Sequence, residues 1–257
     1  MRNLCWLALL SCSWASADTQ VKVEANTFLR LPAAGASLLL NRLELGEHAT
    51  LILPASLKEL HVDQLLLAAN AHIGIVPDPQ DFLLSVGRAE LAPGSYISAR
   101  GAAGNINKPA TPGRNLHVRL EHVQLTDLTL DVRGGAGAAG VRGQDGVAGE
   151  SGGCFWGQAD AGASGQAAGA GEPGAAGGAV RLEVPADFPA QALQINLQGG
   201  MGGPAGVPGM GGRGGAMTDC MIYDVDAARD GQSGSVSHAG GSGAEGSFKL
   251  LRLSTED

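Results

Sequence analysis

Apolar residues recur along residues 27–99 with a period of roughly 22 residues, which lies within the range of repeats that stack on one another. Within each unit, apolar and polar side chains alternate over short stretches, as expected of β-strands that bury one face. The second unit repeats the first at the interval from Leu38 to Leu60, and the third repeats the second at the slightly longer interval from Leu60 to Leu84. The three sets are Leu38, Leu40, Leu43, Leu45, Ala49, Leu51 and Leu53; Leu60, Val62, Leu65, Leu67, Ala71, Ile73 and Ile75; and Leu84, Val86, Ala89, Leu91, Ser95, Ile97 and Ala99. Units this small must stack on their neighbours to bury a face, so the pattern predicts an all-β fold built as a short parallel β-solenoid.

Segments rich in Gly interrupt the strand pattern after residue 99. The apolar alternation of residues 128–132 and of residues 193–197 runs directly into a Gly pair, at Gly134 and at Gly199. The chain is expected to return as strands at residues 116–120, 180–184 and 248–253. The predicted organisation is a signal peptide at 1–17, solenoid turns at 18–133 that continue at 179–198 and 247–253, and glycine-rich excursions at 134–178 and 199–246.

Gly occupies every third position over long runs of both excursions. The runs are Gly137, Gly140, Gly143, Gly146, Gly149 and Gly152; Gly162, Gly165, Gly171, Gly174 and Gly177; Gly200, Gly203, Gly206, Gly209, Gly212 and Gly215; and Gly231, Gly234, Gly240, Gly243 and Gly246. A three-residue period suits an extended helix of the polyproline II type, which has no internal hydrogen bonds and needs partners for its backbone groups. We therefore expect inserted polyproline/polyglycine-II helical hairpins that pack side by side, with Gly facing the neighbouring run. A flexible glycine-rich linker is the alternative.

One cysteine lies at the turning point of each excursion. The interval from Gly134 to Cys154 equals the interval from Gly200 to Cys220. At about 3.1 Å per residue, both cysteines lie roughly 60 Å along extended arms. They are the only cysteines after the predicted signal peptide, and an exported chain favours a disulfide between them. Two free thiols are the alternative.

The side chains around these cysteines differ from the small side chains of the runs. Phe155 and Trp156 follow Cys154, whereas Met217, Met221, Ile222 and Tyr223 flank Cys220. Exposed aromatic and Met clusters mark recognition surfaces, so these residues are the candidate partner-binding site. The alternative is that they only pack on one another over the end of the bundle. Asp219, Asp224, Asp226 and Asp230 are weak metal candidates, because their spacing departs from a calcium-binding loop and suits a solvated acidic rim.

These features resemble known architectures. The strand-forming part is similar to a right-handed parallel β-helix. The collagen-like glycine runs resemble the polyglycine-II-type bundles of bacteriophage adhesin tips and of glycine-rich antifreeze proteins. In the adhesins, recognition lies in the loops that join the glycine helices, which implies residues 154–161 and 216–230 here. The antifreeze proteins use a flat face of small residues, which implies the Ala-rich positions of the runs.

The first 17 residues are typical of a secretion signal. Arg2 supplies the basic start, residues 4–10 form a short apolar core, and residues 15–17 form a small-residue cleavage site. A lipid anchor at Cys12 is the alternative, because the preceding residues loosely resemble a bacterial lipobox. No later apolar run approaches the roughly 20 residues of a membrane span. We therefore expect a secreted, periplasmic or cell-surface protein.

Charge and motif content argue against several classes of function. The formal net charge is −8 without a basic cluster, which disfavours nucleic-acid binding. A GxGxxG match at Gly135 to Gly140 lacks the helix that a dinucleotide site requires, and a GxSxG match around Ser151 lacks a strand-turn-helix context and a His partner. The histidines, which are His48, His61, His72, His117, His122 and His238, have no metal-ligand spacing. We expect no cofactor and no catalytic site.

The sequence thus predicts an exported, non-catalytic structural or adhesion-type protein. Its disulfide-clasped glycine-rich tip would recognise a protein or glycan ligand. An ice-binding or surface-coating protein is one alternative, based on the small side chains of the runs. A polysaccharide-active β-helix enzyme is the other, because such enzymes often use this fold.

Overall fold

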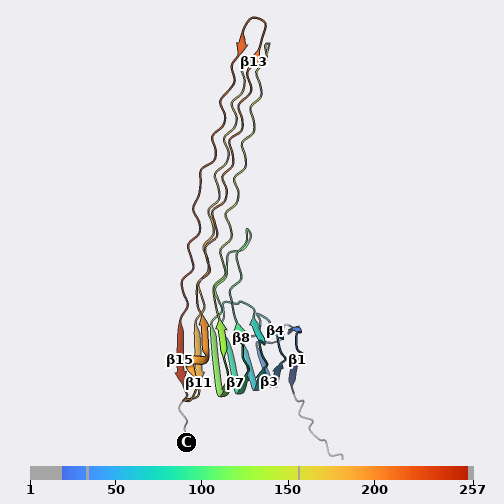
Figure 1. The fold of residues 1–257 in the computed structure, drawn as a ribbon, viewed down its shortest axis with the longest axis vertical. Coiled ribbons are helices and arrows are strands. Elements are labelled where there is room, and N and C mark those ends of the chain that lie inside the picture. Colours follow the sequence, from blue (N-terminus) through green and yellow to red (C-terminus); the bar gives the residue numbers. More distant parts are fainter. Residues whose placement is uncertain (1–18, 33–34, 156, 254–257) are drawn as a thin grey trace, which may run out of the picture.

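Two large parallel β-sheets form a base, and long segments extend from it to a distant tip (Figure 1). The computed structural model describes residues 19–32, 35–155 and 157–253. The larger sheet has seven strands in the order β1 (Gln20–Val23), β3 (Ser37–Leu45), β5 (Glu59–Leu67), β7 (Phe82–Leu91), β9 (Leu116–Leu125), β11 (Val180–Val184) and β15 (Phe248–Arg252). The smaller sheet has six strands in the order β12 (Leu193–Asn196), β10 (Leu128–Asp131), β8 (Ser95–Ser98), β6 (His72–Ile75), β4 (Thr50–Leu53) and β2 (Phe28–Arg30). A 3₁₀ turn, η1 (Ala190–Ala192), precedes β12, and β13 (Thr218–Asp219) pairs antiparallel with β14 (Asp224–Val225) at the tip.

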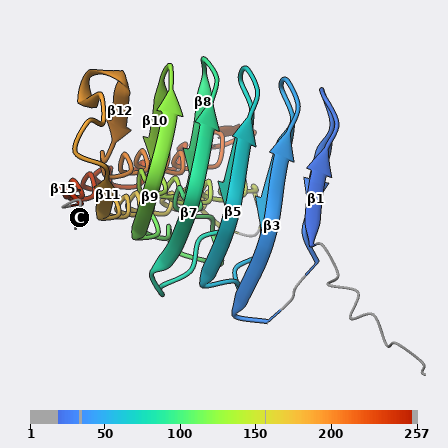
Figure 2. The ribbon, with the colours of Figure 1, turned by 90° about the horizontal axis from the view of Figure 1, so that it is seen from below.

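Successive strands from β1 to β12 alternate between the two sheets, and neighbours within each large sheet are parallel. Figure 2 shows the strands of the larger sheet side by side from β1 to β11. The predicted all-β class with parallel strands is confirmed. The predicted right-handed parallel β-helix is wrong, because the strands form two large parallel sheets of seven and six strands. A regular apolar repeat arises wherever the chain adds one strand to each of two sheets in turn. The repeat therefore indicates the spacing between paired strands, but it does not show that the strands close into solenoid turns.

The intervals at which the apolar pattern repeats in the sequence are the observed strand registers. Leu38 pairs with Leu60 across β3 and β5, and Leu60 pairs with Leu84 across β5 and β7. Because side chains alternate between the faces of a strand, this register places equivalent Leu and Val residues in rows on the same face. The repeat in the sequence is therefore a direct record of strand pairing.

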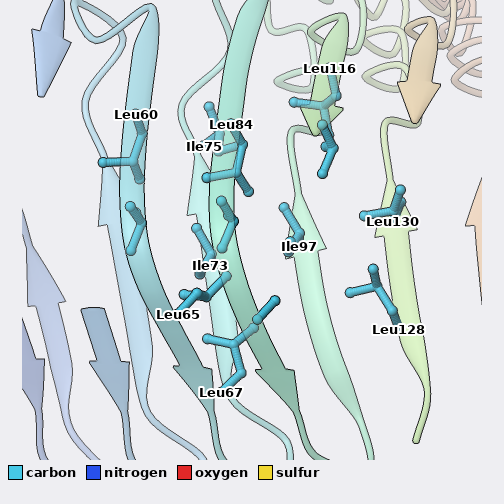
Figure 3. Packing of buried hydrophobic residues seen from close by; sticks show 14 of the residues in the cluster. Leu60, Leu65, Leu67, Ile73, Ile75, Leu84, Ile97, Leu116, Leu128 and Leu130 are labelled. Atoms are coloured by element: carbon cyan, nitrogen blue, oxygen red, sulfur yellow. The ribbon is translucent and has the colours of Figure 1, made fainter. Parts of the chain in front are cut away.

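The inward-facing side chains of both sheets form one apolar core. Figure 3 shows members of this core, among them Leu60, Leu65 and Leu84 from the larger sheet and Ile73 and Ile97 from the smaller sheet. None of these side chains is more than 2% exposed. Full burial of one such side chain contributes about 1.5 to 3 kcal/mol, so the base is a well-packed support for the segments that extend from it.

A fully buried arginine holds one end of this core. Arg114 is 1% exposed and lies immediately before the strands that carry the first long segment. Its Nε donates to the Gln80 carbonyl at 2.8 Å, and its Nη2 donates to the Leu57 carbonyl at 2.8 Å. The guanidinium also lies 5.2 Å from the centre of the Phe82 ring. Burial lowers the pKa of Arg114, whereas the nearby Asp78 and Asp81 oppose this effect.

Replacing Arg114 should destabilise the base. Arg114→Met removes the donors to the buried Leu57 carbonyl and to the part-buried Gln80 carbonyl. A buried carbonyl left without a partner costs roughly 1 to 3 kcal/mol. Arg119→Met is the matched control, because the Arg119 side chain is 47% exposed and pairs only with an exposed Glu121. Chemical denaturation should show a loss of several kcal/mol for the first variant and little change for the second. Equal stability of the two variants would contradict this role.

Candidate functional site: the tip of the glycine-rich segments

Four glycine-rich runs connect the base to the tip. They are the first outward run (residues 134–152), the first return run (162–177), the second outward run (199–215) and the second return run (231–246). They contain no helix or strand and extend side by side (Figure 1). The outward runs follow β10 and β12 of the smaller sheet, whereas the return runs lead into β11 and β15 of the larger sheet. The two layers of the base are thereby continued along the runs.

Ladders of backbone hydrogen bonds connect the four runs. The glycine N–H groups of the first outward run donate to the second outward run, beginning with Gly137 to the Met201 carbonyl at 2.8 Å. The second outward run donates to the first return run, as in Gly209 to Gln166 at 3.0 Å. The first return run donates to the second return run, which donates back to the second outward run. The first return run and the second outward run each bond to all three other runs, so they form the centre of the assembly.

Close approach of the runs explains the glycine at every third position. A Cβ atom added at Gly137 would lie 2.0 Å from the Glu172 carbonyl oxygen, and one added at Gly209 would lie 1.9 Å from the Gln144 carbonyl oxygen. Real Cβ atoms essentially never come closer than 3.0 Å to such an atom. Any side chain at these positions would separate the runs and break the ladders.

A buried carboxylate fixes the point where the first outward run leaves the base. Asp131, at the end of β10, accepts a hydrogen bond from Arg133 Nη2 at 2.6 Å and another from the Tyr96 hydroxyl. Burial alone would raise the pKa of Asp131, but the hydrogen bonds from Arg133 and Tyr96 outweigh it and lower the pKa. The carboxylate therefore stays charged and holds Arg133, which precedes Gly134.

His72 lies near Asp131, and its ring nitrogen is 2.7 Å from the Ser98 hydroxyl. Burial lowers the pKa of His72, and the negative charge of Asp131 opposes this. Sequence reasoning treated His72 as a dispersed histidine and did not single out Tyr96 or Asp131. His72, Tyr96 and Asp131 lie on β6, β8 and β10, which are neighbours in the smaller sheet. Their proximity could have been inferred from the sequence only if the pairing of these three strands had been known.

Several cross-links hold the tip together. The predicted disulfide between Cys154 and Cys220 is present, with 5.8 Å between the Cα atoms. The Tyr223 hydroxyl donates to the Cys154 carbonyl at 2.5 Å, and the Thr218 hydroxyl donates to the Gly152 carbonyl at 2.8 Å. The turn of the first excursion and the β13–β14 turn of the second are therefore joined covalently and by hydrogen bonds.

The predicted partner-binding residues are exposed at this tip. We call Phe155, Met217, Met221, Ile222 and Tyr223 the apical patch. Phe155, Met221 and Ile222 have almost all of their surface exposed, and about half of Met217 and Tyr223 is exposed. Trp156, the remaining predicted member, lies outside the described residues. The described apolar side chains of the patch therefore leave at least half of their surface exposed.

The acidic residues near the tip have different surroundings. The Asp230 carboxylate accepts a hydrogen bond from the Gly214 N–H at 2.8 Å and so supports the backbone of the second outward run. Asp219 and Asp224 face each other across the β13–β14 pair. Among the described residues, no group of three or more His, Cys, Asp or Glu side chains could hold a metal ion.

A cleft of about 720 Å³ lies beside the apical patch. It is lined by Gly153, Gly157, Gln158, Ala159, Tyr223, Asp224, Val225, Asp226, Ala227, Ala228 and Arg229. Sequence reasoning named Tyr223, Asp224 and Asp226 individually, whereas Gln158 and Arg229 were included only as members of the implied recognition loops 154–161 and 216–230. Neither of these two carries a motif, because only the folding back of both excursions places them on one cleft.

Comparisons with known proteins identify no relative. No family model, no curated protein and no solved structure matches the chain. The expected resemblance to bacteriophage adhesin tips and glycine-rich antifreeze proteins is therefore not supported, because no such protein matches the chain. In this chain the three-residue glycine spacing reflects how closely the extended runs pack.

The structure bears on location through two observations. In the described part of the chain, no helix is long and apolar enough to cross a membrane. The Cys154–Cys220 disulfide is compatible with an oxidising, extracellular location. The expected signal peptide and the lipid-anchor alternative at Cys12 lie outside the described residues.

Two neighbouring glycines test the packing of the runs. A Cβ at Gly240 would lie 2.0 Å from the Glu172 carbonyl oxygen, whereas a Cβ at Gly241 would meet nothing within 4 Å. Gly240→Ala should therefore destabilise the protein by about 1 to 3 kcal/mol through overpacking, and Gly241→Ala should not. Thermal unfolding and amide exchange along the ladders measure both effects. Similar behaviour of the two variants would show that the runs are not closely packed.

Removal of the disulfide should loosen the tip without separating the runs. In the chain-entropy account, a bond between cysteines at a sequence separation of 66 contributes about 4 kcal/mol. In the double variant Cys154→Ser, Cys220→Ser, amide exchange should rise in the two tip turns and stay slow in the ladders. Peptide mapping of the unreduced wild-type protein should find neither cysteine alkylated. Alkylation of both cysteines without reductant would contradict the disulfide.

Proposed function

We propose that this chain is an exported, non-catalytic protein that presents the apical patch to a partner at the end of a rigid stalk. The runs act as two hairpins of polyglycine-II-type helices inserted into the strand-forming base. The observation that carries the proposal is the apical patch itself, which is exposed at the disulfide-linked end farthest from the base and contains Phe155, Met221 and Ile222 with almost all of their surface exposed.

The first support for this proposal is the length and stiffness of the stalk. The segment from Gly134 to Cys154 extends roughly 60 Å at about 3.1 Å per residue. The ladders link each run to at least two others, so the stalk resists bending more than a single extended segment would. A stiff stalk holds the tip away from the base and reduces the conformational entropy lost when the tip binds.

The second support is the chemistry of the tip. Apart from Phe155 and Trp156, the sequence of the first excursion consists mainly of Gly, Ala and polar residues near its turning point, and the second excursion adds Met221 and Ile222. Exposure of these apolar side chains to water is unfavourable by about 25 cal/mol per Å² of apolar surface, and contact with a partner would recover that free energy. The disulfide and the Tyr223 hydrogen bond hold the two turns together before binding.

A triple substitution at the tip tests this function. Phe155→Ser, Met221→Ser, Ile222→Ser removes three side chains that are at least 95% exposed, so the fold should be retained. Binding of the labelled protein to surfaces or cells that capture the wild-type protein should fall by roughly tenfold or more, which corresponds to about 1.4 kcal/mol or more.

The matched control lies on the side of the stalk. Met201→Ser, Val207→Ser, Met210→Ser removes the same kind of side chain from exposed positions of the second outward run. This variant should bind like the wild-type protein. Loss of binding in the stalk variant together with full binding by the tip variant would refute the proposal and favour a function of the bundle faces.

The two alternative functions stay predictions. Thermal hysteresis would measure ice binding, and release of oligosaccharides would measure polysaccharide cleavage. Neither has an observation in the described residues that favours it over recognition by the tip.

A further inference from the structure

The cleft beside the apical patch forms where the two return runs first separate. Near the tip, the second return run is held by hydrogen bonds from the Gly162 N–H to the Arg229 carbonyl at 3.0 Å and from the Ala228 N–H to the Gly215 carbonyl at 2.9 Å. Beyond these hydrogen bonds, Gly153, Gly157, Gln158 and Ala159 of the first excursion and residues 223–229 of the second line a cleft of about 720 Å³. Five of the described residues that line it are Gly or Ala, which have no side chain or only a methyl group: Gly153, Gly157, Ala159, Ala227 and Ala228.

The polar side chains in this cleft have no partners within the described part of the chain. Gln158, Asp224, Asp226 and Arg229 make no side-chain hydrogen bond or ion pair there, although charges of both signs are present. Asp230, by contrast, lies just outside the cleft, and its carboxylate is engaged by the Gly214 N–H. The cleft therefore presents an amide, two carboxylates and a guanidinium that are available to a ligand.

One wall of the cleft is an immobilised aromatic ring. Tyr223 lines the cleft with 54% of its surface exposed. Its hydroxyl is held by the Cys154 carbonyl at 2.5 Å, next to the disulfide. The ring orientation is therefore fixed before a ligand arrives, and its exposed surface can contact an apolar face of that ligand.

We infer that this cleft binds a neutral saccharide, as the terminal unit of a glycan on the partner. Carboxylates and a guanidinium form charge-assisted hydrogen bonds with sugar hydroxyls, and a fixed aromatic ring packs against the C–H face of a sugar ring. Asp224 and Asp226 outnumber Arg229 in the cleft, and the whole chain has a net charge of −8. This balance disfavours sialylated and sulfated sugars. The cleft volume lies within the roughly 300 to 1,000 Å³ typical of small-ligand sites.

This inference rests on the proposed function of the tip, and it names the chemistry of the partner. The test uses the full secreted chain on an array of immobilised neutral, sialylated and sulfated oligosaccharides, followed by calorimetry with the neutral saccharide that binds best. Asp226→Ala removes a carboxylate from the cleft, and Ala227→Phe fills the cleft without removing a polar group. Glu150→Ala is the matched control, since it removes an exposed carboxylate of the first outward run that does not line the cleft.

Binding of a neutral saccharide should weaken by roughly tenfold in Asp226→Ala and be lost in Ala227→Phe, while Glu150→Ala binds like the wild-type protein. The inference is overturned if no oligosaccharide binds, if only sialylated or sulfated ones bind, or if binding survives Ala227→Phe. Peptide mapping of the disulfide verifies that each variant retains its folded tip. If cell binding depends on the apical patch and no oligosaccharide binds, the saccharide inference fails while the proposed function stands.

Discussion

The contact between a glycine α-carbon and a carbonyl oxygen of the neighbouring run sets the geometry of the extended part of this protein. A Cβ at most of the triplet glycines would lie far inside van der Waals contact with a backbone carbonyl oxygen or amide nitrogen of another run. At this separation the glycine N–H reaches a carbonyl of a third run, so close packing and hydrogen bonding depend on the same missing side chain. Many of the residues between successive glycines range from Ala to Met and Arg. In the second outward run, however, Gly202, Gly211 and Gly214 occupy such positions and are confined in the same way, since a Cβ there would lie 1.9 to 2.1 Å from a carbonyl oxygen.

The order of the runs follows from the order of the strands. Each outward run continues a strand of the smaller sheet, and each return run enters a strand of the larger sheet. Because both sheets are parallel and gain their strands alternately, the outward runs form one layer and the return runs form the other. Asp131 and Arg133 fix the departure of the first outward run, and the equal intervals from Gly134 to Cys154 and from Gly200 to Cys220 then bring the two cysteines together.

The tip differs from the stalk because the pattern of Gly at every third position ends there. Without the need for Gly at every third position, the chain can carry Phe155, Met221, Ile222 and Tyr223, and it forms the short β13–β14 pair. The loss of ladder rungs that allows these larger residues also opens the cleft between the return runs. The disulfide compensates by holding the two turns together where the ladders no longer do so.

The sequence by itself determined the all-β class, the register of β3, β5 and β7, and the pairing of Cys154 with Cys220. These features are local or periodic: alternation reveals a buried face, a constant shift reveals strand pairing, and equal arm lengths reveal which cysteines meet. Only the tertiary structure decided that the regular apolar period produces two large sheets and not a β-helix, because alternation along a strand does not record which sheet the next strand joins. It also decided the cluster of His72, Tyr96 and Asp131 and the cleft with Gln158 and Arg229. Their members come from segments far apart in the chain, and no spacing in the sequence encodes their meeting.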